Sequence, residues 1–105
     1  MNSGALPFLD PRLHEPGRLA VVSVLAAVPS RTFTELRDET GLTDGNLGAH
    51  VKVLEKARYV RTRSARRAGG NRATTEIALT TKGQAAFRNY LDSLEAIVRG
   101  AAPRH

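Results

Sequence analysis

Apolar residues recur at helical spacing in three stretches of the chain, and each stretch predicts an amphipathic helix. The three sets are Val21, Leu25 and Val28; Leu47, Val51 and Leu54; and Phe87, Tyr90, Leu91, Leu94, Ile97 and Val98. Pro16 marks the start of the first helix, because proline is tolerated at the first helical position, and Pro29 marks its end. Asp10 and Pro11 predict a short helical turn before it, and Val53 is expected to widen the buried stripe of the second helix.

A shorter helix is predicted directly before the second of these helices. Thr34 can cap a helix over residues 35–40, and Gly41 suits the left-handed position that commonly ends a helix. Thr43 then stands at the N-cap of a helix over residues 43–57. Two helices joined by so short a turn form a helix-turn-helix pair.

After the helix pair, the pattern changes from helical to extended. The segments YVRTRSAR (59–66) and ATTEIALT (73–80) are rich in β-branched residues, and RAGGN (67–71) between them carries turn residues. This arrangement predicts a β-hairpin with a basic tip. Residues 31–33 are expected to form a short extended connector before the helix pair, and Thr80 is expected to cap the last helix.

The predicted order of elements is helix, helix, turn, helix, hairpin and helix, which is the order of a winged helix-turn-helix. The predicted fold class is therefore mainly α with a small β-hairpin. All 105 residues fit a single domain, with a core over 9–79, a C-terminal helix over 80–99 and a frayed tail over 100–105. The apolar stripe of the last helix is long for so small a domain, which hints at contact with a second copy.

The positive charge of the chain is concentrated in its central third. The whole chain has a net charge of +6, and residues 43–75 alone, with eight basic and two acidic residues, also carry +6. A localised basic block is typical of a protein that binds a polyanion, although a solvated face is the alternative for the charge alone. Because the block coincides with the second helix of the pair and the hairpin, fold and charge together favour double-stranded DNA.

Composition excludes several other classes of protein. The absence of cysteine excludes disulfides, zinc–thiolate sites and thiol catalysis. No apolar run is long enough to span a membrane, and the N-terminus lacks the pattern of a signal peptide, so we expect a cytoplasmic protein. The serine, histidine and carboxylate residues form no recognisable catalytic, nucleotide or metal motif, so we expect no enzyme activity, no cofactor and no metal site.

Three segments resemble winged-helix transcriptional regulators of the MarR and ArsR type, in particular the small single-domain winged helix DNA-binding proteins. They are LDPRLHEPGRLAVVSVLAA (9–27), FTELRDETGLTDGNLGAHVKVLEKARYV (33–60) and LTTKGQAAF (79–87). The resemblance implies a homodimer on a near-palindromic operator, with helix 43–57 in the major groove, a wing over 64–74 and the terminal helices at the dimer interface. The implied interface residues on the last helix are Phe87, Tyr90, Leu91, Leu94, Ile97 and Val98.

The resemblance carries two further expectations. A small-molecule effector between the terminal helices and the core is a hypothesis, since no residue defines its pocket. Repression is the expected sign of regulation, because we see no separate activating domain.

Arg58 departs from the family pattern, in which a glycine usually follows the recognition helix. An arginine at this position must tolerate a strained backbone or end the helix differently. It can also reach a DNA phosphate.

The first turns of the helix over 43–57 carry the candidate contacts to DNA, because the N-terminal residues of a recognition helix face base edges. Asn46 can pair with adenine, and Ala49 can contact a thymine methyl group. Asp44 either stabilises the helix dipole, which we favour, or accepts a hydrogen bond from cytosine. His50 is expected to be packed or bonded to phosphate. The full set is Thr43, Asp44, Gly45, Asn46, Ala49, His50 and Lys52.

Gly45 and Gly48 raise a question, because glycine in a helix interior is unfavourable by about 1 kcal/mol relative to alanine. Close approach of the helix backbone to DNA would explain both glycines. Gly45 stands at the helix start, where propensity matters least. Tight packing on the preceding helix, or simple drift, is the alternative explanation.

In the wing, the candidate contacts are Arg66, Arg67, Asn71 and Arg72. Arginine enters a narrow minor groove readily, and a solvated loop is the alternative. The main rival function is a winged helix that binds an acidic protein without binding DNA. An RNA-binding protein is a weaker rival, because few aromatic residues are available to stack on bases.

Overall fold

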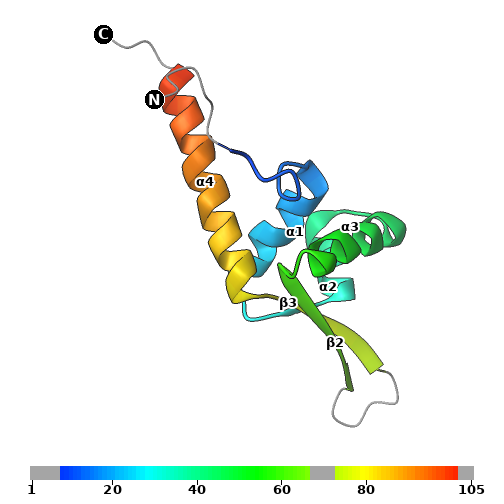
Figure 1. Cartoon of the computed structure of the whole chain (residues 1–105). Coiled ribbons are helices and arrows are strands. Elements are labelled where there is room, and N and C mark those ends of the chain that lie inside the picture. The colour runs from blue at the N-terminus through cyan, green and yellow to red at the C-terminus, as the bar shows by residue number, and fades with distance from the viewer. Residues whose placement is uncertain (1–7, 67–72, 102–105) are drawn as a thin grey trace.

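The computed structural model of the chain describes residues 8–66 and 73–101 (Figure 1). The helices are α1 (Pro16–Ala26), α2 (Phe33–Thr40), α3 (Asp44–Lys56) and α4 (Thr81–Ala101), and the strands are β1 (Arg31–Thr32), β2 (Val60–Arg66) and β3 (Ala73–Leu79). The strands form one antiparallel sheet in the order β1–β3–β2. The predicted fold class is confirmed, and the extended connector contributes an edge strand that the sequence did not predict.

The core lies between α1, α2, α3 and the inner face of the sheet. Its fully buried residues are Leu13, Val21, Val22, Leu36, Leu47, Leu54 and Ile77. Most of these residues come from the predicted helical stripes and from the second strand of the predicted hairpin. The hairpin of β2 and β3 extends away from this body, and α4 runs along the opposite side (Figure 1).

Helix α2 begins earlier than we predicted from the sequence. Its N-cap is Thr32 and not Thr34: the Thr32 hydroxyl accepts from the Glu35 amide at 3.1 Å, and the Glu35 carboxylate accepts from the Thr32 amide at 2.9 Å. This reciprocal capping box satisfies two amides that a helix start leaves unpaired. Pairing of β1 with β3 keeps the chain extended up to Thr32, so the helix begins at Phe33.

A polar contact ties the N-terminal turn to the start of β2. The Leu13 and His14 amides donate to the Asp10 carbonyl, which forms the predicted turn. The Tyr59 hydroxyl donates to the buried Asp10 carboxylate. Burial is the main cause that raises the pKa of the Tyr59 phenol above its usual value of 10.0, so the hydroxyl keeps the proton that it donates.

Helix α4 begins with the predicted cap and continues beyond the predicted end. The Thr80 hydroxyl accepts from the Gly83 amide at 2.9 Å, as an N-cap does. The helix has 21 residues, about 30 Å at 1.5 Å per residue, and it continues to Ala101, whereas we expected a frayed tail from residue 100. Within the described parts of the chain, no helix is long and apolar enough to cross a membrane.

Candidate nucleic-acid interface

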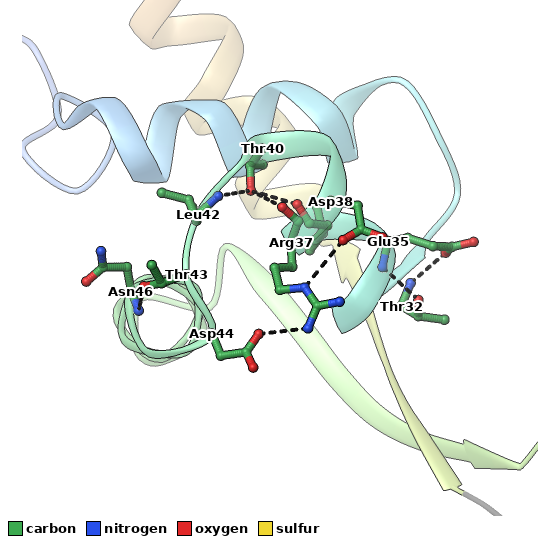
Figure 2. A network of polar contacts seen from close by, with 10 residues as sticks. Thr32, Glu35, Arg37, Asp38, Thr40, Leu42, Thr43, Asp44 and Asn46 are labelled. Atoms are coloured by element: carbon green, nitrogen blue, oxygen red, sulfur yellow. Dashed lines mark hydrogen bonds and ion pairs between the residues drawn. The ribbon is translucent and has the colours of Figure 1, made fainter.

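The turn between α2 and α3 fixes how the helix-turn-helix pair is held (Figure 2). Gly41 ends α2 with a positive φ of 74°, and its amide donates to the Arg37 carbonyl at 2.9 Å. Thr43 caps α3 by accepting from the Asn46 amide at 3.1 Å. Both caps were predicted from the sequence. They set α3 at a defined angle to α2 with three residues between the helices.

Helix α3 separates into a buried face and an exposed face. Leu47, Val51 and Leu54 are buried, as their spacing predicted. The prediction that Val53 widens this stripe is wrong: Val53 is 39% exposed, because its place on the helix turns it away from the core. The remaining exposed residues of the helix are Asp44, Gly45, Asn46, Ala49, Lys52, Glu55 and Lys56. The exposed face therefore carries small side chains near the N-terminus of the helix and two lysines, Lys52 and Lys56, toward its C-terminus.

The two helical glycines lie against open space. A Cβ atom built on Gly45 or Gly48 meets no atom of the described residues within 4 Å. Packing of Gly48 on the preceding helix is therefore not the reason for this glycine. The protein itself leaves room beside both positions, and a partner that approaches α3 closely would fill it.

Asp44 has a partner that the sequence did not reveal. The Arg37 guanidinium donates to its carboxylate at 3.1 Å and also reaches the Asp38 carboxylate at 3.4 Å (Figure 2). Asp44 also stands in the first turn of α3, where a negative charge is favourable to the helix dipole. The side-chain hydrogen bond to Asp44 is the main cause that raises the pKa of Arg37 above its usual value.

His50 turns toward α1 and not straight toward solvent. Its Nε2 atom lies 3.7 Å from a Glu15 carboxylate oxygen, and its Nδ1 atom lies 3.4 Å from an Arg18 guanidinium nitrogen. The ring also covers Gly17, where an added Cβ would lie only 2.4 Å from His50 Nε2. His50 is thus a packed residue at the border of the exposed face. Packing was one of the two roles that we expected for it, the other being a bond to phosphate.

The wing candidates are only partly within the described structure. Strands β2 and β3 pair in register from Val60–Leu79 to Arg66–Ala73, so the backbone of the wing stem is a regular ladder. Arg66 is described through its backbone alone, and Arg67, Asn71 and Arg72 lie outside the described residues. Their contacts to DNA therefore stay predictions from the sequence.

The outer face of the sheet carries two further arginines. Arg61 lies opposite Ala78, and Arg63 lies opposite Glu76, to which it donates at 3.2 Å. With Pro29 and Ser30, these residues line a groove of about 300 Å³. Because Glu76 neutralises Arg63, Arg61 is the stronger of the two candidates for a contact with an anion.

Arg58, which stands where the family usually has glycine, adopts a strained backbone conformation, the first of the two alternatives that we considered for it. Its φ is 65°, a left-handed value that is unfavourable for any residue with a Cβ atom. Its carbonyl oxygen accepts from the Thr80 hydroxyl at 2.6 Å, so the α4 cap helps to hold the turn. The Arg58 side chain is exposed.

The apolar stripe of α4 is partly buried against the core and partly exposed to solvent. Tyr90 is 4% exposed and lies 3.0 Å from His14 Nδ1 through its hydroxyl, so within this chain it is a core residue and not a surface residue. Phe87 and Leu94 are partly buried against the same core, and Ile97 is partly buried as well. Leu91 is 45% exposed and Val98 is 62% exposed. Part of the predicted dimer surface is therefore open to solvent.

Metal binding finds no support in the described part of the chain, where no three histidine or carboxylate residues gather to hold an ion. The arrangement as a whole is that of a winged helix-turn-helix protein: a capped helix pair, a second helix with an exposed face that carries Lys52 and Lys56, and an adjoining antiparallel hairpin.

Comparison with known proteins places the chain in a family. The model of the family described as a winged helix DNA-binding domain matches residues 18–98, and the chain belongs to this family. An uncharacterized protein of Methanocaldococcus jannaschii, MJ0432, is 36% identical over 74 residues, which cover 70% of this chain and 78% of the relative. The predicted resemblance to winged-helix regulators is thereby confirmed.

Solved structures share the fold. The transcriptional regulator homologue protein of Pyrococcus horikoshii OT3 superimposes with a TM-score of 0.79 at 28% identity, over 88% of this chain and 89% of that one. BpsR of Bordetella bronchiseptica, whose DNA binding is regulated by 6-hydroxynicotinic acid, superimposes with a TM-score of 0.66 at 14% identity, over 90% and 68% of the two chains. The chain is therefore a winged-helix DNA-binding protein of the transcriptional regulator type.

Proposed function

We propose that the chain is a homodimeric repressor that binds a near-palindromic operator, with α3 in the major groove and the wing on the adjacent minor groove or backbone. Family membership supports DNA binding as such. The finer statement rests on the exposed face of α3 and on the position of the basic residues beside it.

The exposed face of α3 is the observation that carries this proposal. Gly45, Gly48 and Ala49 leave the first turns of the helix without bulky side chains, and nothing in the described part of the chain fills the space at either glycine. A smooth helix surface lets the backbone come close to base edges. Gly48, one turn inside the helix, is unfavourable for the helix itself, and a function at this surface would explain why the helix carries it.

Affinity and specificity are expected to come from different residues. Lys52 and Lys56 lie exposed on α3 and are suited to phosphate contacts, which position a protein without reading sequence. Asn46 stands exposed in the first turn, where an amide can pair with adenine. The wing arginines Arg66, Arg67 and Arg72 would add contacts to the backbone or the minor groove.

A homodimer would place two copies of α3 about 34 Å apart, one turn of the DNA helix. The exposed apolar residues of α4 support contact with a second copy, because Leu91 and Val98 stay open to solvent among the described residues of the single chain. As a repressor, such a dimer would act by occupying the operator.

An effector is part of the proposal as well. A cavity of about 200 Å³ lies between the N-terminal turn and α4, with Asp10, Tyr59 and Tyr90 among its lining residues. The DNA binding of BpsR, which shares the fold, is regulated by 6-hydroxynicotinic acid. A screen of metabolites that changed neither the DNA affinity nor the melting temperature of the protein would remove the effector from the proposal.

The first experiment is fluorescence anisotropy with a random-sequence duplex across a series of salt concentrations. The native protein is compared with the triple variant R66A/R67A/R72A. The proposal predicts that log affinity falls linearly with log salt and that the slope is smaller in the variant by about 0.9 for each phosphate that its side chains no longer neutralise. Failure of the native protein to bind even at low salt would contradict DNA binding and favour a module that binds an acidic protein.

A further inference from the structure

Arg37 and Asp44 form an ion pair across the turn of the helix-turn-helix. Arg37 lies in the last turn of α2, and Asp44 is the first residue of α3. The guanidinium Nη1 donates to Asp44 Oδ1 at 3.1 Å, and Figure 2 shows the two side chains meeting beside the start of α3. The pair therefore stands at the end of α3 that faces base edges in the proposed complex.

The backbone around the pair fixes both of its members. The Arg37 carbonyl accepts from the Gly41 amide at 2.9 Å, and the left-handed Gly41 turns the chain directly into the α3 cap. Asp44 follows the N-cap residue Thr43, whose hydroxyl holds the Asn46 amide. The side chains thus meet because the turn has a defined geometry, and not because two flexible segments happen to touch.

The ion pair contributes little to folding stability. The Arg37 side chain is 38% exposed and the Asp44 side chain is 69% exposed. Exposed ion pairs of this kind are largely screened by water and stabilise proteins only slightly. Its consequence for the surface is greater: the guanidinium, which also contacts the Asp38 carboxylate at 3.4 Å, offsets part of the negative charge that DNA phosphates would otherwise repel.

One oxygen of the Asp44 carboxylate stays available. Arg37 binds Oδ1, and the described residues provide no hydrogen-bond partner for Oδ2. A carboxylate accepts hydrogen bonds and cannot donate them, which matches the exocyclic amine of cytosine in the major groove. Thymine presents an oxygen acceptor at the corresponding position, which an ionised carboxylate would repel.

We propose that Arg37 is a positioning residue for base recognition: it holds Asp44 so that the free carboxylate oxygen accepts from the N4 amine of a cytosine. This inference rests on the proposed function, because it requires that the first turn of α3 faces base edges. Of the two roles that the sequence suggested for Asp44, it selects acceptance from cytosine over the helix-dipole role that we had favoured.

The experiment first selects the preferred duplex of the native protein from a random-sequence pool. Affinities are then measured by anisotropy for that duplex, for versions in which single C·G pairs are changed to T·A, and for a random duplex. The variants are R37Q, D44A and the double variant R37Q/D44A. The control is R99Q, which removes the same charge and an exposed ion pair with Glu95 at 2.9 Å at the far end of α4.

The native protein is expected to lose roughly 5- to 150-fold in affinity when one particular cytosine is replaced by thymine. R37Q and D44A should each abolish most of this preference, and the double variant should lose no more than D44A. On the random duplex, R37Q should weaken binding no more than R99Q does. Melting temperatures of R37Q and R99Q should match, which shows that both variants are folded.

Three outcomes would overturn the inference. If D44A discriminates between cytosine and thymine as the native protein does at every position, Asp44 does not recognise a base, although DNA binding itself would stand. A loss of random-duplex affinity in R37Q, with the cytosine preference unchanged, would show that Arg37 contacts phosphate directly. Absence of any DNA binding by the native protein would remove the proposed function itself.

Discussion

Gly83 and Gly48 differ in what a side chain at each position would meet. A Cβ atom on Gly83 would lie 2.1 Å from the Tyr59 carbonyl oxygen, so the start of α4 can approach the residue before β2 only with glycine there. A Cβ atom on Gly48 would meet nothing within 4 Å among the described residues. Gly83 is therefore explained by packing inside the chain, whereas close approach of a partner is the explanation that we propose for Gly48.

Replacing Gly48 with alanine should stabilise the fold and weaken DNA binding at once. The added methyl group improves helix propensity by about 0.5–1 kcal/mol without a clash, and it stands in the space that DNA would occupy. The melting temperature and the affinity for a duplex are measured on the same sample. G100A is the control, because its Cβ is equally unobstructed but lies near the end of α4. Unchanged affinity in G48A would speak against close approach at this position.

At the scale of elements, α1 is held at its start by a single carboxylate. Glu15 is the N-cap, and its side chain accepts from the Arg18 amide at 2.7 Å. The same carboxylate faces His50 on α3, so it also links α1 to α3. The hydrogen bond from Arg18 is the main cause that lowers the pKa of Glu15 below its usual value of 4.5.

Glu15→Ala should lower the free energy of unfolding by about 1 kcal/mol at neutral pH, which is typical for the loss of an N-cap. Because the pKa of Glu15 is lowered by folding, its contribution is complete above 4.5 and is lost as the pH falls through its folded value. Melting curves of native protein and variant should therefore converge below pH 4.5. Glu95→Ala, in an exposed ion pair of α4, serves as the control. A difference in melting temperature between the native protein and the variant that stays constant down to acid unfolding would contradict this role of Glu15.

The sequence predicted most elements because their signals are local. Apolar spacing, the caps at Thr43 and Thr80 and the left-handed Gly41 are each specified within a few residues. The start of α2 was missed because both Thr32 and Thr34 can cap a helix, and pairing of β1 with the distant β3 decides between them. This error follows from a contact between segments that are far apart in the sequence.

The candidate site was predicted less completely for the same reason. The buried stripe of α3 follows from its helical period, and Val53 is the one residue assigned to that stripe that is exposed. The contacts of Arg37 with Asp44 and of His50 with Glu15 depend on the angles between helices, which no local pattern specifies. A basic residue in the last turn of α2 was the one available signal for Arg37.

At the scale of the whole molecule, the proposed homodimer would form through α4. Val98 and Leu91 are exposed on a helix whose first half already packs on the core through Tyr90 and Phe87. Charged side chains on this face would oppose burial against a second copy, because an unpaired buried charge is costly.

Val98→Glu should therefore convert the protein from dimer to monomer in sedimentation equilibrium. It should also reduce the affinity for a two-half-site duplex by at least about tenfold, since the avidity of two linked sites disappears. Ala96→Glu, which introduces the same charge at an exposed position on another side of α4, should change neither property. A native protein that sediments as a monomer would contradict the homodimer, and a V98E protein that stays dimeric would place the interface elsewhere.

The location of the DNA surface is tested most directly by recording backbone amide chemical shifts while a short duplex is added to the labelled protein. Binding through α3 and the wing predicts the largest changes over residues 43–52 and at the wing stem, around residues 64–66 and 73–74. Changes should be small over the second half of α4, residues 91–99. The largest changes on α4 would contradict this location of the DNA surface.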